Sequence, residues 1–396
     1  MTSEYNADTG EILDYPIRSA FQNFYPSYKL NHTVSAEQAK AAECISACKT
    51  GKFGYTIALC PECGYRRIHS CSCNNRDCPC CQAPLEKKWV MERDSELISG
   101  IAYYHVIFTL PHELNPLILA NQKMLYNLLF SAATDSLITI CRNRKYMGAT
   151  PGIVSVLHTW GQQLNFHPHL HVCLSGGGLT PDGNFIEARH KGFVIPQRVL
   201  SKVFRGKFLA GLKAMHDNGK LVFSNDAEPL RNSYRWKEWI DHLYKIDWLP
   251  FLKETFNGNG NAIKYLARYA YRTAISNARI LDVSAESVTL SYTDYADHNK
   301  KKRLVLPGNE FIRRFLVHIL PAGFHRVRFA GFLANCQKAK KLALIGKLRH
   351  TPYAGNPVKG KKMPEILMMI YGIDICTCPD CHAKMIAYRC NHPPNF

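Results

Sequence analysis

The chain of 396 residues carries 50 lysines and arginines against 31 aspartates and glutamates, which gives a formal net charge of +19. This excess of positive charge favours a polyanionic partner, above all nucleic acid, over a neutral small molecule. The 46% hydrophobic and 11% aromatic content excludes a disordered basic tail and, with the length, predicts two or three folded domains.

The amino-terminal segment predicts a polar leader followed by a helix. MTSEYNADTGEILDY has no basic flank followed by an apolar core, and nowhere in the chain do 18 apolar residues run uninterrupted. We therefore expect a soluble, unexported protein without a membrane partner. The stretch SAEQAKAAECISACKT is rich in helix formers, and Ser35 can cap that helix.

The cysteines that follow predict zinc binding. Nine of the 16 cysteines lie between residues 44 and 81, and such clusters bind zinc more often than they form disulfides in a reducing compartment. Two C-x-x-C pairs in this cluster each offer two thiolates to a tetrahedral ion and predict a zinc ribbon, namely Cys60 with Cys63 and Cys78 with Cys81. Further candidate ligands are close enough for two ions, and their pairing stays open: Cys44, His69, Cys71 and Cys80.

A core domain is predicted after the cysteine cluster. Residues 85–99 have a helical pattern, and IAYYHVIFTLP is a buried strand ended by Pro111. Residues 115–146 carry apolar residues at helical spacing, and PGIVSVLHTW and HPHLHVCLSGGG predict a hairpin around GQQLNF. Residues 195–216 are predicted to be helical and basic. A Gly/Asn-rich loop is predicted to precede a helix in NAIKYLARYAYR. Residues 280–306 have the alternating pattern of strands, and residues 311–349 are strongly basic.

The hairpin contains the first chemical signature, His169-Leu170-His171. Residues i and i+2 of a strand project from the same face, so both imidazoles can reach one ion. We expect Gln162 as third ligand, with Gln163, His158 and His167 as alternatives. A hard ion such as Mg or Mn accepts imidazole with oxygen ligands and leaves positions for phosphate oxygens. The alternative is a pair of ordinary strand histidines.

Two tyrosines form the second signature. Tyr265 and Tyr269 lie four residues apart in KYLARYAYR, so a helix places both hydroxyls on one face. A phenol is a competent nucleophile at phosphorus beside a metal, and two phenols allow cleavage of a donor and a recipient strand. Three basic residues are placed to contact phosphates: Lys264, Arg268 and Arg272. The alternative is aromatic packing against a core.

Two basic or cysteine-rich segments complete the chain. Basic residues interleave with phenylalanines in the first of these segments, and they include KKKR at residues 300–303, Arg326 and Arg328. This pattern suits binding of single-stranded DNA, with a solvated charged face over a buried core as the alternative. The segment CTCPDCHAKMIAYRCNH predicts a separate small zinc knuckle around Cys378 and Cys381, with a frayed tail as the alternative. Closed four-thiolate sites are structural, so we expect no catalysis by zinc.

In combination, these motifs resemble a known family. FTLP at 108–111, HLH at 169–171 and YLARY at 265–269 occur in the order of rolling-circle nucleases. From about residue 35 to about 345 the chain resembles the two-tyrosine HUH transposases of the insertion-sequence-ninety-one family, in which U is a hydrophobic residue. The supporting segments include CPECG, CNNRDCPCCQ, HTWGQQLNFHPHLHV, GGGLTPDG, VLSKVFRGKFLAGL, AISNARIL and FHRVRFAGFLAN.

The resemblance implies an α+β fold, with the histidines on a central strand of an HUH-endonuclease antiparallel sheet and packed helices, an amino-terminal zinc-ribbon-like domain and a small carboxy-terminal zinc knuckle. It implies boundaries near residues 1–95, 96–282, 283–350 and 351–396. Cys48 and Cys73 match family positions and would join the zinc ligands. The zinc domain would present arginines to the element ends, such as Arg66, Arg67 and Arg76.

The mechanism that the resemblance implies is strand transfer. Tyr265 or Tyr269 would attack one end of a mobile element, form a 5′-phosphotyrosine and release a 3′-OH, and a second transesterification would join the strand to target DNA. We expect a bacterial, nucleoid-associated enzyme acting on single-stranded DNA. The alternatives are a plasmid replication initiator or relaxase and a non-catalytic zinc-dependent DNA-binding regulator. The order of attack by the two tyrosines, the DNA sequences and the oligomeric state stay open.

Overall fold

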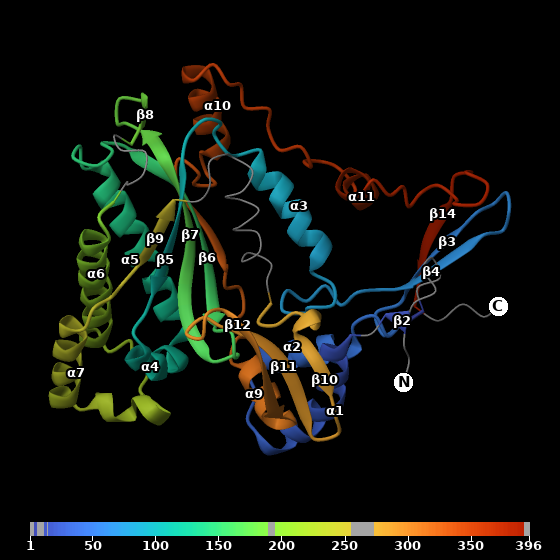
Figure 1. Cartoon of the computed structure of the whole chain (residues 1–396), viewed down its shortest axis with the longest axis horizontal. Helices are drawn as coiled ribbons and strands as arrows, with labels where there is room; N and C mark the ends of the chain where they lie inside the picture. The colour runs from blue at the N-terminus through green and yellow to red at the C-terminus, as the bar shows by residue number, and fades with distance from the viewer. Residues whose placement is uncertain (1–3, 6–11, 14, 189–194, 255–272, 392–396) are drawn as a thin grey trace.

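The computed structural model describes residues 4–5, 12–13, 15–188, 195–254 and 273–391. Within these residues the fold is α+β, as predicted, and is organised around an antiparallel sheet flanked by helices (Figure 1). A smaller unit of helices and strands and a cysteine-rich three-stranded ribbon lie beside it (Figure 1). Two short strands near the amino terminus pair with each other, β1 (Glu4–Tyr5) and β2 (Ile12–Leu13).

The central sheet has the strand order β13-β6-β7-β5-β9, and β8 also pairs with β7. The predicted hairpin is confirmed, since β6 (Thr150–Trp160) and β7 (Phe166–Leu179) pair antiparallel. The predicted strand before Pro111 is β5 (Tyr103–Thr109), which pairs with β7. The remaining strands are β8 (Phe185–Glu187), β9 (Phe251–Glu254) and β13 (Val327–Gly331). The basic segment predicted at 311–349 therefore contributes an edge strand to this sheet.

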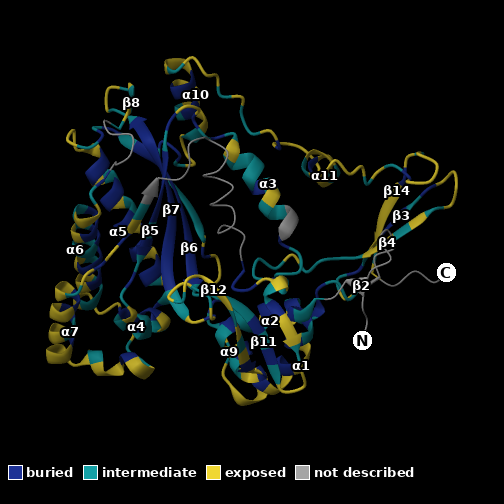
Figure 2. Cartoon of the chain, in the orientation of Figure 1, coloured by how far each residue is buried: buried dark blue, intermediate teal, exposed yellow. Residues whose placement is uncertain are grey.

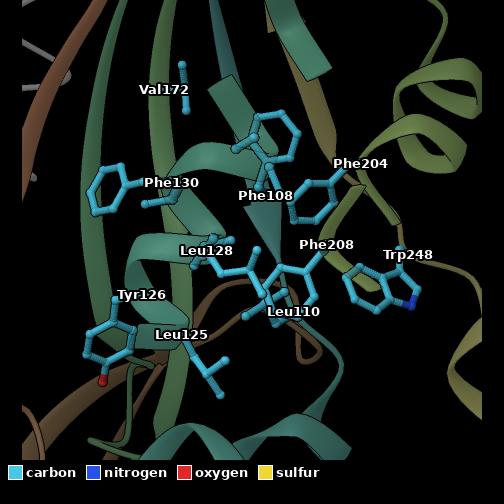
Figure 3. Close-up of a cluster of buried hydrophobic side chains, with 14 of the residues drawn as sticks. Phe108, Leu110, Leu125, Tyr126, Leu128, Phe130, Val172, Phe204, Phe208 and Trp248 are labelled. Atoms are coloured by element: carbon cyan, nitrogen blue, oxygen red, sulfur yellow. The ribbon is translucent and has the colours of Figure 1, made fainter. Parts of the chain in front are cut away.

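Helices cover one face of the sheet and form its main core. They are α4 (Asn115–Ala120), α5 (Gln122–Arg142), α6 (Gln197–Asp217) and α7 (Ser233–Lys245). Because strand side chains alternate, Leu170, Val172 and Leu174 all face these helices. Figure 3 shows the aromatic part of this core, where Phe108, Phe204 and Trp248 lie together.

Helix α5 is long and apolar enough to cross a membrane by length and composition, but 61% of its most apolar window is buried inside the protein. Its Leu125, Leu129 and Ala133 belong to the main core. The apolar character of α5 therefore fits a core helix.

The opposite face of the sheet packs against α3 (Ala83–Asp94) and α10 (Lys338–Leu348). Val154, Val156 and Cys173 point to this side, where they meet Trp89 and Leu342. The histidines of β7 occupy the same alternate positions as Cys173, so they also lie on this face.

A second core joins both ends of the sequence. Helices α1 (Pro16–Asn31), α2 (Ala36–Ala47) and α9 (Gly308–Leu316) pack on β10 (Ile280–Val283), β11 (Ser287–Asp294) and β12 (Lys300–Pro307). The predicted cap is confirmed, since the Ser35 hydroxyl accepts from the Gln38 N–H and the Gln38 side chain accepts from the Ser35 N–H. Helix α1 lies in the segment predicted to be a polar leader, and its Phe21 packs edge-on against Phe315 at 5.0 Å between ring centroids.

The ribbon consists of three strands in the order β14-β3-β4. They are β3 (Tyr55–Leu59), β4 (Arg66–Ser70) and β14 (Ile386–Cys390), and α11 (Met363–Tyr371) leads to β14. Short 3-10 helices complete the described elements at His112–Leu114, Asn225–Arg231 and Asn277–Arg279. Figure 2 shows that β14 is largely exposed, in contrast to the buried strands of the central sheet.

Candidate active site and zinc centres

Three imidazoles meet at one end of the central sheet. His158 lies on β6, directly opposite His169 of β7 in the strand register, and His171 lies two residues further along β7. One ring nitrogen from each histidine lies within 4.8 Å of the others, and all three side chains are buried. The Nε2 atoms of His169 and His171 are 3.1 Å apart. The structure therefore brings both predicted histidines together and adds His158, one of the alternatives to Gln162.

Hydrogen bonds fix how these rings point. Nδ1 of His169 lies 2.7 Å from the carbonyl oxygen of His167, to which only a protonated nitrogen can donate. The neutral His169 ring therefore carries its lone pair on Nε2. Nδ1 of His171 is 2.9 Å from Nε2 of His105. When His171 donates in that bond, the Nε2 lone pairs of both β7 histidines face one point, as binding of a cation requires.

Burial keeps His169 and His105 uncharged at neutral pH. Desolvation lowers the pKa of His169 to about 4 and the pKa of His105 to about 4. A metal ion binds the neutral imidazole, so the His169 ring is in the required protonation state. The residues present therefore fit a divalent cation.

The histidines line a cavity of about 790 Å³. Gln162 also lines it, and its Nε2 donates to the Tyr295 hydroxyl at 3.0 Å. Arg279 supports this wall, because its guanidinium donates to the carbonyl oxygens of Ser291 and Gln162. The cavity is thus bounded by the β6–β7 hairpin on one side and by β11 and its turn on the other.

Sequence reasoning did not identify Arg279, Tyr295 or His105 as site residues. His105 had a recognisable signal, since it is the polar residue within the apolar run IAYYHVIFTLP. Tyr295 comes from the segment predicted as alternating strands and Arg279 lies directly before that segment, and only the fold brings them to the hairpin. The predicted nucleophiles and their basic neighbours lie outside the described residues: Tyr265, Tyr269, Lys264, Arg268 and Arg272.

All eight predicted zinc cysteines fall into two groups of four. The first group joins the end of α2 to the loop before α3, and consists of Cys48, Cys73, Cys78 and Cys81. Its Cys73 and Cys81 sulfurs are 3.8 Å apart, and the Cys73 N–H donates to the Cys48 sulfur at 3.5 Å. Side-chain hydrogen bonds from neighbouring thiols lower the pKa of Cys48, and the bond from Cys73 has the largest effect. A lower pKa favours the thiolate, which is the form that zinc binds.

The second group combines two cysteines from the amino-terminal region with two from the carboxy-terminal region, and consists of Cys60, Cys63, Cys378 and Cys381. The Cys60 and Cys63 knuckle therefore does not share a group with Cys78 and Cys81, and the carboxy-terminal knuckle is not a separate site as predicted. The backbone N–H of Cys63 is the main cause that lowers the pKa of Cys60 to about 7. The predicted structural role is supported by four sulfurs in each group, which leave no open position on a tetrahedral ion.

The arginines predicted to bind DNA divide into two kinds. Arg76 donates to the carbonyl oxygens of Phe324 and Leu320, at 2.7 and 3.0 Å. Arg326 contacts Asp77 at 3.4 Å, so both arginines brace the loop before β13 against the cysteine loop.

Arg328 also has partners within the protein. Its guanidinium donates to the Asn127 side chain and lies 4.2 Å from the Phe130 ring centroid. On β4, by contrast, Arg66 is exposed and Arg67 is half-buried. Of the described arginines predicted to bind DNA, Arg66 is therefore the most accessible to a phosphate.

Two protein families and two known transposases match this chain. Residues 152–340 match the family described as "Putative transposase", and residues 20–110 match the family described as "Transposase zinc-binding domain". The chain is 37% identical over 369 residues to a protein of Sinorhizobium fredii (strain NBRC 101917 / NGR234) named "Putative transposase y4qJ", covering 92% of each chain. It is 28% identical over 347 residues to the "Transposase for insertion sequence element IS801" of Pseudomonas savastanoi pv. phaseolicola, covering 86% of this chain and 80% of that one. No solved structure matches.

Proposed function

This chain belongs to the IS91 family of transposases, and from that premise we propose that it nicks and rejoins single-stranded DNA through a 5′-phosphotyrosine intermediate. The proposed reaction moves an insertion sequence by a rolling-circle-like mechanism. Its substrates are the single-stranded ends of the element and a target DNA. The observation that carries the proposal is the convergence of His158, His169 and His171 in a cavity.

The three histidines would hold a divalent cation, Mg or Mn. A cation there would polarise the scissile phosphate and offset charge as it develops on the phosphate oxygens. The chain supplies the supporting hydrogen bonds, since His105 and the His167 carbonyl orient His171 and His169 respectively. The proposal replaces Gln162 by His158 as third ligand, because Gln162 donates to Tyr295.

Tyr265 and Tyr269 are the proposed nucleophiles. The phenol oxygen of one tyrosine attacks phosphorus, and the bond from phosphorus to the 3′ oxygen breaks. The phenol loses its proton in this step, and the departing 3′ oxygen gains one to become the 3′-OH. The product is a 5′-phosphotyrosine that retains the phosphodiester energy. In the second step a 3′-OH attacks that phosphorus and the tyrosine leaves, so rejoining requires no outside energy source.

DNA binding in this proposal rests on charge. The net charge of +19 favours phosphate contacts, which lose affinity steeply as salt rises. Arg66 and Arg67 on β4 are proposed to contact the element ends, and Lys264, Arg268 and Arg272 to contact phosphates beside the tyrosines. The zinc domain is proposed to be structural.

Tyrosine variants test the proposal. Tyr265→Phe, Tyr269→Phe and the double variant are compared with the wild type for nicking of a labelled single-stranded oligonucleotide carrying an element end. We expect the double variant to lose nicking, whereas Tyr271→Phe, two positions after Tyr269 in the same sequence motif, keeps it. Nicking by the double variant at the wild-type rate would overturn the nucleophile assignment and favour a different class of DNA-acting protein.

A further inference from the structure

Two knuckles at opposite ends of the sequence have the same local design. CPEC at residues 60–63 and CPDC at residues 378–381 each place proline and an acidic residue between two cysteines. In the first knuckle the Cys60 N–H donates to the Tyr65 carbonyl oxygen at 2.8 Å. In the second, the Cys378 N–H donates to the Ala383 carbonyl oxygen, also at 2.8 Å. Both bonds span five residues.

The turn after each knuckle is also the same. The N–H of Gly64 donates back to Cys60, and the N–H of His382 donates back to Cys378, each at 3.1 Å. Gly64 has a φ of 76° and His382 a φ of 59°, so both occupy the left-handed region. A non-glycine residue enters that region at a cost, which the closed turn at His382 must offset.

The two knuckles face each other. The Cys60 sulfur lies 3.3 Å from that of Cys381, and the Cys63 sulfur lies 3.5 Å from that of Cys378. These distances exclude disulfide bonds, whose sulfurs are about 2 Å apart. Four thiolates at about 2.3 Å from one zinc ion are separated by about 3.8 Å in a tetrahedron. The burial repeats too, since Cys60 and Cys378 are buried while Cys63 and Cys381 are exposed.

The surrounding ribbon has too little apolar core to hold itself together. Its buried cluster consists of Ala58, Cys60, Cys378 and Met385. Strand β14 pairs with β3 over five residues, and four of the five β14 residues are exposed (Figure 2). Small units of this kind need a metal or a disulfide for stability.

We infer that Cys60, Cys63, Cys378 and Cys381 bind one zinc ion jointly, so that the carboxy-terminal segment completes the amino-terminal zinc ribbon. Residues 378 and 381 lie outside both segments that match known families. The ion links cysteines up to 321 positions apart and fastens α11 and β14 to the ribbon. With the group of Cys48, Cys73, Cys78 and Cys81, the chain binds two zinc ions. This inference does not depend on the proposed reaction.

Zinc content of the full chain tests the shared site. The number of zinc ions per chain is measured by inductively coupled plasma mass spectrometry after the purified protein has been dialysed exhaustively. We expect two ions in the wild type and one in each double variant, Cys60→Ser with Cys63→Ser or Cys378→Ser with Cys381→Ser. The decisive comparison is between the double and quadruple variants, because the group of Cys48, Cys73, Cys78 and Cys81 is intact in all of them. A shared site predicts one remaining ion in each double variant and in the quadruple variant. Three ions in the wild type, two in each double variant and one in the quadruple variant would indicate two independent knuckle sites and overturn the inference. The matched control, Cys336→Ser with Cys376→Ser, replaces two exposed cysteines outside both groups and should keep two ions.

A cleavage experiment tests the same site without relying on a count. A protease recognition sequence is inserted at the exposed Lys359–Lys361 segment, ahead of α11, in the otherwise intact protein. After cleavage we expect the carboxy-terminal fragment to co-elute with the rest of the chain in size-exclusion chromatography. The same insertion in the Cys378→Ser, Cys381→Ser background should release the fragment. Retention of the variant fragment, or release of the wild-type fragment in the presence of bound zinc, would show that zinc does not join the two ends.

Discussion

His105 and His171 form a buried histidine pair on neighbouring strands, with Nε2 of His105 2.9 Å from Nδ1 of His171 and the two rings within 4° of parallel. The bond occupies the ring nitrogen of His171 that points away from His169. It leaves Nε2 of His171 directed at Nε2 of His169, 3.1 Å away. His105 is therefore a positioning residue for the proposed metal site, because it sets the ring orientation and tautomer of a ligand.

Replacement of His105 tests this role. His105→Phe should lower the affinity for Mn by about 10- to 100-fold, the usual effect of removing a partner that orients a metal ligand. His105→Gln, which retains a polar group, should recover part of the affinity. Titration calorimetry measures the affinity, and nicking activity of His105→Phe should recover at high Mn. Unchanged Mn affinity in His105→Phe would show that the pair has only a packing role.

His158 and Gln162 should behave differently when each is replaced by alanine. His158 lies in the three-histidine group, whereas Gln162 donates to Tyr295. We expect His158→Ala to abolish measurable Mn binding, because only two imidazoles remain, and Gln162→Ala to change the affinity less than tenfold. Both variants are compared by the same calorimetric titration. A larger loss in Gln162→Ala would restore glutamine as the third ligand.

The pH dependence of stability should reflect buried histidines, of which His318 lies apart from the metal group. Its Nε2 donates to the Leu164 carbonyl oxygen at 3.2 Å, its Nδ1 accepts from the Thr159 hydroxyl at 3.1 Å, and burial lowers its pKa to about 4 from 6.5. Between these pH values the unfolded chain binds more protons, so stability is full above about 6.5 and falls as pH drops towards 4. A shift of this size corresponds to about 3 kcal/mol.

The measurement is the free energy of unfolding from denaturant titrations at pH 7, 6 and 5. We expect His318→Gln to be less stable than wild type at pH 7 but to lose less stability on acidification. Equal losses in the two proteins between pH 7 and 5 would contradict the assignment of part of this dependence to His318.

Two glycines with nearly equal backbone angles allow a matched test of the edge strand. Gly331 has φ 64° and Gly323 has φ 66°. A Cβ at Gly331 would lie 1.6 Å from the Pro151 carbonyl oxygen, whereas a Cβ at Gly323 would meet nothing within 4 Å. Gly323→Ala should therefore cost about 1 kcal/mol for backbone strain alone. Gly331→Ala should cost at least about 2 kcal/mol more, because β13 must shift. Thermal unfolding measures both, and equal melting temperatures would argue against close pairing of β13 with β6.

Much of the fold could be predicted from local patterns. The β6–β7 hairpin follows from two apolar runs around a short polar segment, and α2 follows from Ser35 and helix-forming residues. Local patterns do not reveal which distant segments pair. Strand β13 is a five-residue element in a basic region, and its place beside β6 depends on contacts more than 150 positions away.

In the candidate site, too, local patterns predicted individual residues but not their partners from distant segments. The alternation of a strand predicted that His169 and His171 share a face, and C-x-x-C spacing predicted the zinc cysteines. Neither pattern specifies a partner from another element, so His158 was one alternative among several and Cys60 was not matched with Cys381. The family resemblance implies DNA binding for Arg76, and the interleaving of arginines with phenylalanines predicts it for Arg326. Their bonds to Phe324 and Asp77 depend on tertiary packing, which neither pattern reveals.

The central claim is that a tyrosine of the 265–269 motif attacks DNA, and trapping the covalent product tests it most directly. The wild-type protein is incubated with Mn and a single-stranded oligonucleotide from an element end, then digested, and the modified peptide is sequenced by mass spectrometry. The account predicts a 5′-phosphonucleotide on the phenol oxygen of Tyr265 or Tyr269 and a free 3′-OH on the released fragment. An adduct on any other residue, or efficient nicking with no covalent adduct, would contradict it.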